Sequence, residues 1–268
     1  MKSDLKTRHG GRILADALAA QGVKLAFGVP GESYLPVLDG LHDLRDKLSF
    51  IVCRQEGGAS YMAEAYGKLT GEPGVLFVTR GPGATNGAIG VHTGFQDSTP
   101  MIVFIGQVGN EFAEREAFQE IDYRRMYGQM AKWVAQIDRV ERIPEYVSRA
   151  FHTAMAGRPG PVVLALPEDT LFAEAAVADV PRHHTVRPAA SALEVAKASE
   201  LPPVQKDPSS SLAGAAGPAR PAASCSAGSR GAVCRSAPRS AARTSSTTAV
   251  PATRATSASA STRSLRRE

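Results

Sequence analysis

The sequence comprises 268 residues, with 31 Lys and Arg against 26 Asp and Glu and a formal net charge of +5 at pH 7. Residues 1–207 contain 22 Lys and Arg against 25 Asp and Glu, whereas residues 208–268 contain nine Arg against one Glu. The basic character therefore belongs to the C-terminal part of the chain, and it gives no reason to expect a nucleic-acid-binding surface on the rest.

Composition divides the chain in the same way. No Phe, Tyr or Trp follows Phe172, and residues 202–268 consist mainly of Arg, Ala, Ser, Pro, Thr and Gly. Such a segment has too few large apolar side chains to offset the entropy of ordering its backbone. We therefore expect a folded domain over residues 1–175, a linker over 176–201 and a disordered tail over 202–268. No signal peptide and no apolar run of membrane-spanning length is recognised, so a cytoplasmic protein without a membrane partner is expected.

Helical and strand patterns alternate along the first 172 residues. Helices are predicted up to Gly22 and over residues 34–44, 57–69, from about 84 onward and 142–156. Strands are predicted over residues 25–29, 50–53, 74–79, 101–105, 133–137 and 161–166. This alternation predicts an α/β fold with a six-stranded, mainly parallel sheet and helices on both of its faces.

Glycine-containing segments follow four of the predicted strands. They are residues 30–32, 54–58, 80–83 and 106–108. Because ligands of parallel sheets bind at the carboxyl ends of the strands, these segments are expected to form one binding edge.

The segment TRGPGATN at residues 79–86 is the most specific local signal. Its Gly-Pro-Gly run is expected to break the chain before a helix, and it would let the backbone approach a planar ligand. The alternative is a plain turn from strand to helix. No G-x-G-x-x-G follows the first strand and no P-loop occurs, which excludes the common nucleotide-binding motifs.

Glu56 stands between a predicted buried strand and an Ala-rich helix. Taken alone, it is better interpreted as a solvated or helix-capping acid than as a catalytic residue, because carboxylates are favoured near a helix start. The adjacent pair His183-His184 lies in a polar linker without companion ligands, so we interpret it as a solvated loop and expect no metal site.

Six short segments occur in order along the first 162 residues: VPGE (29–32), RQEGGA (54–59), GPGATN (81–86), GQV (106–108), AFQE (117–120) and GRPGPV (157–162). Over about residues 10–172 the chain resembles the N-terminal, pyrimidine-binding domain of acetolactate (acetohydroxyacid) synthases and related thiamine-diphosphate enzymes. Two positions depart from the usual pattern. Arg80 stands where the synthases commonly have a small residue such as serine, and Val29 where many have tyrosine.

The resemblance assigns roles to particular residues. In that family a glutamate at the position of Glu56 hydrogen-bonds a ring nitrogen of the cofactor's aminopyrimidine and activates the cofactor. Gln119, a candidate catalytic residue, and Phe118 would lie on the substrate side. The pyrimidine pocket would be lined by Pro30, Gly31, Pro82, Gly83 and Asn86.

The resemblance also implies an activity. Decarboxylation of a 2-oxo acid such as pyruvate would be followed by formation of a carbon–carbon bond, as in branched-chain amino acid biosynthesis. Full-length relatives form homodimers or homotetramers, and some use FAD. They hold the diphosphate through Mg²⁺ at a Gly-Asp-Gly run, which does not occur in this sequence. We therefore expect a truncated form that is inactive alone, with residues 202–268 read out of frame.

Two alternatives remain. The chain could be the pyrimidine-domain subunit of a split thiamine-diphosphate decarboxylase or lyase. It could also be a non-enzymatic fragment whose Arg-containing tail binds nucleic acid, although that tail has no aromatic residues for base stacking.

Overall fold

The computed structural model describes residues 5–186, 189–200, 209–212 and 233–236. In the predicted tail, these ranges include two four-residue strands, β9 (Ser209–Leu212) and β10 (Val233–Ser236), which pair in parallel. The rest of the prediction for residues 202–268 lies outside the described residues. Among those that are described, no helix is long and apolar enough to cross a membrane.

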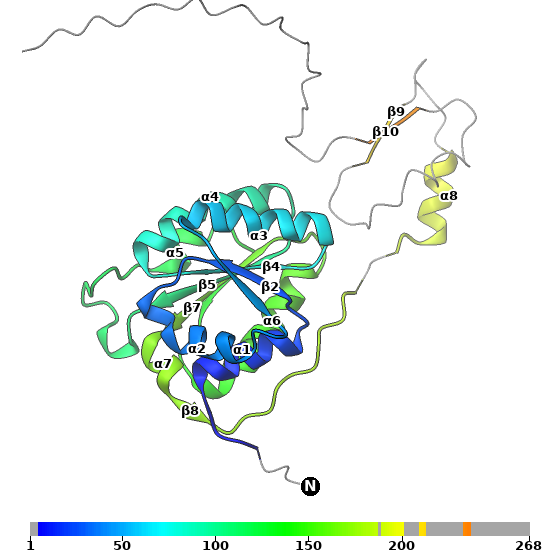
Figure 1. Ribbon diagram of the computed structural model, residues 1–268. Helices are drawn as coiled ribbons and strands as arrows, with labels where there is room; N and C mark the ends of the chain where they lie inside the picture. The colour runs from blue at the N-terminus through cyan, green and yellow to red at the C-terminus, as the bar shows by residue number, and fades with distance from the viewer. Residues whose placement is uncertain (1–4, 187–188, 201–208, 213–232, 237–268) are drawn as a thin grey trace, which may run out of the picture.

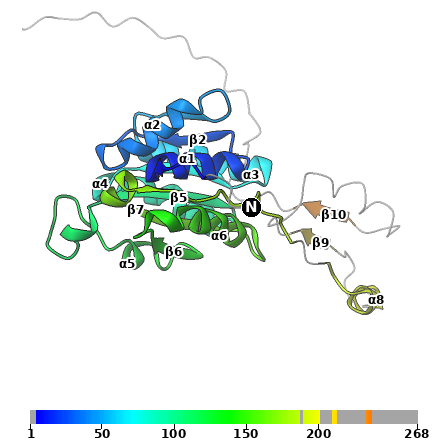
Figure 2. The same ribbon diagram turned by 90° about the horizontal axis from the view of Figure 1, so that it is seen from below.

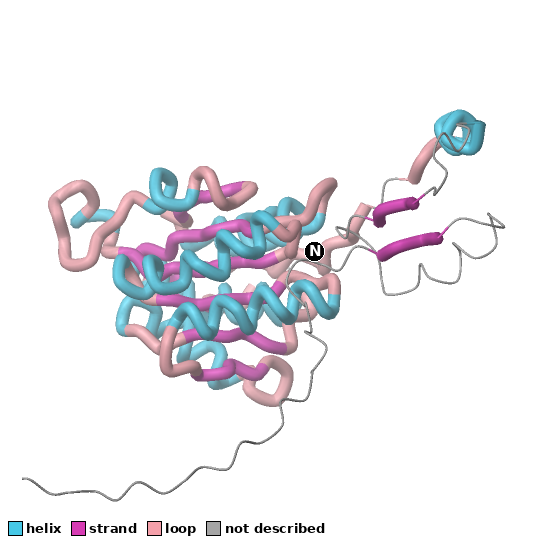
Figure 3. The backbone as a smooth tube through the Cα atoms, turned by 90° about the horizontal axis from the view of Figure 1, so that it is seen from above, coloured by secondary structure: helices cyan, strands magenta, loops and turns pink. Residues whose placement is uncertain are grey.

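A six-stranded sheet forms the centre of the domain (Figures 1 and 3). Its strand order is β3-β2-β4-β5-β7-β6, and every neighbouring pair is parallel. The strands are β2 (Leu25–Gly28), β3 (Ser49–Val52), β4 (Gly74–Val78), β5 (Met101–Gln107), β6 (Trp133–Gln136) and β7 (Pro161–Pro167). The predicted α/β fold and all six predicted strands are confirmed.

Helices cover both faces of this sheet. The helices α1 (Gly10–Ala20), α2 (Leu35–Asp43) and α6 (Ile143–Met155) pack on one face, and Figure 2 views the molecule from that side. The other face is covered by α3 (Glu56–Thr70), α4 (Gly81–Gln96) and α5 (Tyr123–Tyr127). The central strands are buried on both sides. This burial explains why the sequences of the central strands are continuously apolar. Between the strands and the helices of one face, Phe77 and Phe104 stack with ring centroids 4.9 Å apart.

Two helix starts position the candidate site. Helix α3 begins at Glu56 because the side chain of Gln55 accepts a hydrogen bond from the Gly58 amide at 2.9 Å. Helix α4 begins at Gly81, so the expectation that residues 81–83 precede the helix was wrong. Pro82 fits the first turn because the amide that proline lacks has no intrahelical partner there.

The first part of the linker packs against the domain. Strand β8 (Glu174–Ala175), which follows α7 (Glu168–Phe172), pairs antiparallel with β1 (Arg8–His9). Beyond it, residues 177–183 form a docked linker along α1. The buried Gln21 side chain donates to the Pro181 carbonyl at 3.0 Å and accepts from the His183 amide at 2.9 Å. Helix α8 (Ala192–Glu200) follows this segment.

The solvated-loop interpretation of the histidine pair is wrong for His183. Its side chain is buried and packs on Phe151 with ring centroids 5.2 Å apart, whereas His184 is exposed. Within the described residues, no group of three or more His, Cys, Asp and Glu side chains could hold a metal ion.

Candidate functional site

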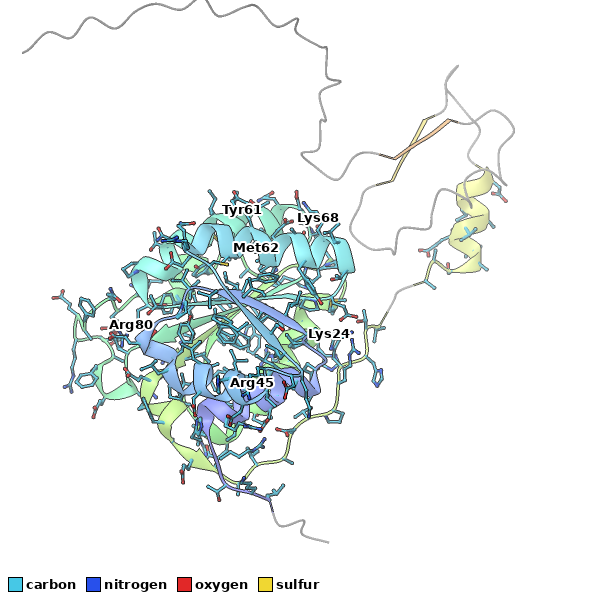
Figure 4. The ribbon with its side chains drawn as sticks, viewed as in Figure 1. Lys24, Arg45, Tyr61, Met62, Lys68 and Arg80 are labelled. Carbon is cyan, nitrogen blue, oxygen red and sulfur yellow. The ribbon has the colours of Figure 1, made fainter. Side chains whose placement is uncertain are left out.

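The loops after the strands gather at the carboxyl edge of the sheet. Arg80 comes two residues after the end of β4, and Lys24 directly precedes β2. Figure 4 shows these two residues at opposite ends of the molecule. The parallel strands therefore deliver their carboxyl ends, and the residues that follow them, to one side of the domain.

Glu56 and Asn86 form the centre of this edge. Glu56 is the first residue of α3 and is half-buried. Its Oε2 accepts a hydrogen bond from Nδ2 of Asn86, on α4, at 3.0 Å. The second oxygen, Oε1, accepts no hydrogen bond from any described residue. One oxygen is thus fixed by the protein, and the other is available to a ligand.

Glycine leaves room beside that available oxygen. A Cβ atom at Gly83 would lie 3.4 Å from Glu56 Oε1 and 2.9 Å from Thr79 Cγ2. A Cβ atom at Gly31 would lie 2.6 Å from Thr79 Cβ. Pro30 and Pro82 are exposed at the same edge. A wall of backbone beside a carboxylate oxygen suits a flat heterocycle with a ring nitrogen. The residues present therefore fit an aminopyrimidine.

Gln119 reaches this edge through its backbone. The Gly81 amide, at the start of α4, donates to the Gln119 carbonyl at 2.9 Å. The Phe118 side chain is 73% exposed. No hydrogen bond joins either of these side chains to Glu56 within the described residues. The structure thus brings Glu56, Asn86, Gly31 and Gly83 to one edge of the sheet. The segment that contains Gln119 lies beside Gly81, at the start of α4.

Arg80 connects the segments that follow β2, β4 and β7 through two ion pairs. It is 8% exposed, and its guanidinium pairs with Glu32 at 2.8 Å and with Glu168 at 3.2 Å. These partners follow β2 and β7, so the side chain connects segments far apart in the sequence. Sequence reasoning noted Arg80 only as a departure from the family pattern. A charged residue directly after a buried apolar strand was the available signal for this role.

Tyr34 is another buried residue of the edge that sequence reasoning did not assign to the site. Its hydroxyl donates a hydrogen bond to the Val29 carbonyl, at the end of the first central strand. Burial raises the pKa of Tyr34 well above its ordinary value, and the charge of Glu56 acts in the same direction. The phenol therefore stays protonated and serves as a hydrogen-bond donor that fixes the segment before Pro30.

A cavity of about 190 Å³ lies on the other half of the edge. It is lined by residues from β5, β6, the segment before α5 and the start of α5, among them Gln107, Glu120, Tyr123 and Gln136. Because Gln119 directly precedes Glu120, this cavity lies next to the segment predicted to face the substrate.

Comparison with known proteins identifies one matching family and several similar enzyme subunits. Residues 8–126 match the family described as "Thiamine pyrophosphate enzyme, N-terminal TPP binding domain". The acetolactate synthase catalytic subunit of Saccharomyces cerevisiae is 42% identical over 164 residues, which is 61% of this chain and 24% of that protein. The large subunits from Lactococcus lactis and Escherichia coli (isozyme 3) are each 40% identical, over 61% and 60% of this chain and 28% of each relative.

The chain spans about a quarter of the length of these relatives. Their names are those of full-length enzyme subunits, whereas the matched region is the part that contains Glu56, Gly81–Gly83 and Asn86. Residues 8–126 therefore resemble the N-terminal TPP-binding domain of thiamine pyrophosphate enzymes, and the longer match is to acetolactate synthase subunits.

Proposed function

We propose that this domain binds the aminopyrimidine of thiamine diphosphate at the carboxyl edge and that Glu56 is the residue that activates it. The observation that supports this is the asymmetric carboxylate: Oε2 accepts a hydrogen bond from Asn86, whereas Oε1 accepts none from the described residues and lies beside Gly83. In this arrangement Asn86 fixes the plane of the carboxylate. Oε1 can then hold a proton against a ring nitrogen. The walls of the pocket are Pro30, Gly31, Pro82 and Gly83.

The activity proposed for the assembled enzyme is carboligation of 2-oxo acids such as pyruvate. When bound, thiamine diphosphate supplies a carbon nucleophile for such substrates. The residues of this chain contribute the substrate side of the site, with Gln119 as a polar group and Phe118 as an apolar wall. Homo-oligomerisation, Mg²⁺ at the diphosphate and FAD belong to the same proposal. The 268 residues contain no Gly-Asp-Gly run, so this polypeptide by itself is expected to show no turnover.

A binding experiment on the full chain tests the role of Glu56. The ¹⁵N-labelled protein is titrated with thiamine, which has the pyrimidine but no diphosphate, and the amide resonances are followed by NMR. We expect shifts at Gly31, Glu56, Gly83 and Asn86, and their loss in Glu56→Gln. Glu145→Gln is the matched control, because Glu145 is also an acid in the first turn of a helix but lies on α6.

Two outcomes would contradict the proposal. Thiamine shifts that persist in Glu56→Gln would show that the carboxylate is not the pyrimidine ligand, and shifts confined to the opposite edge would place the ligand elsewhere. Calorimetry with thiamine diphosphate and Mg²⁺, together with an assay of acetolactate formation from pyruvate, tests the inactivity of the polypeptide alone. Measurable turnover would overturn that part.

A further inference from the structure

The loop over residues 113–120 combines an exposed position with an unusual backbone. Glu114, Glu116 and Gln119 have φ angles of 61°, 52° and 64°, in the left-handed region that side chains other than glycine rarely adopt. Apart from Ala117, Gln119 and Glu120, the side chains of this loop are exposed, so burial in the core does not explain its shape. Such a backbone persists where specific contacts determine it, and residues strained in this way are found most often at functional sites.

Glu120 provides those contacts. Its Oε1 accepts the Glu114 amide at 2.6 Å and its Oε2 accepts the Ala117 amide at 3.1 Å. The Glu120 amide in turn donates to the Ala117 carbonyl at 3.0 Å. Hydrogen bonds from amides to an ionised carboxylate are among the stronger ones in proteins. The carboxylate of Glu120 thus holds together the two ends of its own loop through two backbone amides.

A hydrogen bond joins this loop to the first turn of α4, which begins at Gly81. The Gln119 carbonyl accepts the Gly81 amide at 2.9 Å. That amide belongs to the first turn of α4, where no intrahelical acceptor exists. Gly83, whose missing side chain leaves room at Glu56, lies two residues further along. The left-handed conformation of Gln119 directs its carbonyl to this amide, and the carboxylate of Glu120 holds the loop that sets this conformation.

We propose that Glu120 is a positioning residue: its carboxylate holds the 113–120 loop in the conformation that docks Gln119 onto the Gly81 turn of the pyrimidine pocket. This inference rests on the proposed function, because it gives the docking of Gln119 a role in the cofactor site. Glu120 does not itself face the pyrimidine. It acts through the Gln119 carbonyl and determines how firmly the glycine turn is held.

Amide exchange in the full chain tests this role. Hydrogen exchange of the ¹⁵N-labelled protein is measured for wild type, Glu120→Gln, Glu120→Ala and the control Glu116→Gln, whose side chain is exposed in the same loop. In Glu120→Ala we expect the Gly81 amide to exchange about tenfold faster while the amides of β5 keep their rates, because a local opening leaves the core closed. Glu120→Gln, which keeps an acceptor oxygen, should fall between, and Glu116→Gln should match wild type.

Each other result overturns the proposal. If the Glu114 and Ala117 amides accelerate in Glu120→Ala but Gly81 does not, the carboxylate orders the loop alone. If the β5 amides accelerate as much as Gly81, the effect is global unfolding. The exchange measurement needs no ligand, so it decides the role of Glu120 even if thiamine fails to bind and the proposed function falls. Thiamine titration of the same variants adds a second measurement, with weaker binding expected in Glu120→Ala and unchanged binding in Glu116→Gln.

Discussion

The carboxylate of Glu56 is held by a neutral amide. Asn86 donates a single hydrogen bond to Oε2 at 3.0 Å and brings no charge to the site. A cation in this position would favour the ionised carboxylate so strongly that it would share a proton poorly with a weakly basic ring nitrogen. The amide instead orients the carboxylate without adding a charge beside it.

Replacing this amide with an acid should reveal the geometry. In Asn86→Asp, two carboxylates would stand about 3 Å apart, and their repulsion should lower the free energy of unfolding at pH 7 by about 0.5–1 kcal/mol relative to Asn86→Ala, since the site is partly exposed. At about pH 4, where isolated Asp and Glu carboxyls take up protons, the two variants should converge. Urea unfolding at both pH values measures the difference. Equal stability at pH 7 would show that the two side chains do not meet.

At the residue scale, sequence reasoning named side chains that the structure brings to one edge, but it did not predict their contacts. Glu56, Gly83 and Asn86 stand in recognisable segments, and the structure places them together. The hydrogen bond between Glu56 and Asn86 could not be predicted, because it depends on how α3 and α4 cross. The role of Glu120 was missed for a similar reason, since it depends on three left-handed residues whose sequence shows no glycine.

At the scale of elements, the site depends on the close packing of α3 against α4. Ser60 on α3 donates a hydrogen bond to the Gly87 carbonyl on α4 at 2.7 Å, and a Cβ atom at Gly90 would lie 2.2 Å from Ser60 Oγ. The glycines of α4 therefore allow a helix separation that no larger residue would permit. This separation brings Asn86 within hydrogen-bonding distance of Glu56.

A pair of glycine substitutions tests this packing. Gly90→Ala should lower the free energy of unfolding by about 1–3 kcal/mol, because the new methyl group overlaps Ser60 and forces the helices apart. Gly58→Ala is the matched control: it also lies in a helix, nothing lies within 4 Å of its added Cβ, and it should be neutral or stabilising by up to about 1 kcal/mol. Thermal unfolding of both variants provides the measurement. A Gly90→Ala protein as stable as wild type would show that the crossing is looser than described.

The strands were easier to predict than the helix starts and loops. Continuous apolar runs indicated the inner strands β2, β4, β5 and β7, because the inner strands of a parallel sheet are buried on both faces. The edge strands β3 and β6 are only partly buried, and their short apolar runs were also recognised. The start of α4 was misplaced because proline and glycine signal a break as readily as a first helical turn. The segment between β5 and β6 has no periodic pattern, so its short helix α5 was not predicted.

At the scale of the whole molecule, we expect the docked linker to respond to pH through His183. Burial lowers the pKa of His183 below its ordinary value of 6.5; nearby Glu72 opposes this shift, and His152, Arg182 and His184 add to it. A lowered pKa means that the unfolded chain binds the proton more readily than the folded one. The free energy of unfolding is therefore unaffected by the protonation of His183 above about pH 6.5 and decreases as the pH falls below this value.

Thermal unfolding between pH 8 and pH 5 should show this dependence. We expect the midpoint of the wild-type protein to decrease as the pH falls below about 6.5, and the decrease to be smaller in His183→Gln, which has no ring to protonate. His184→Gln is the matched control, because that side chain is exposed and adjacent in sequence. A His183→Gln protein with the full wild-type decrease would assign the pH response to another group.

The docked linker also determines how the domain can be attached to a surface. Gln21, which holds it, follows the C-terminal end of α1, and Glu72, which pairs with Arg182, precedes β4. Both lie at the amino ends of the strands, the side on which Figure 4 shows Lys24, whereas Arg80 lies at the opposite end. A tether joined beyond residue 183 would therefore leave the Glu56 edge facing the solution. Immobilised in this orientation, the domain would present the edge proposed to bind thiamine to the solution, without steric interference from the support.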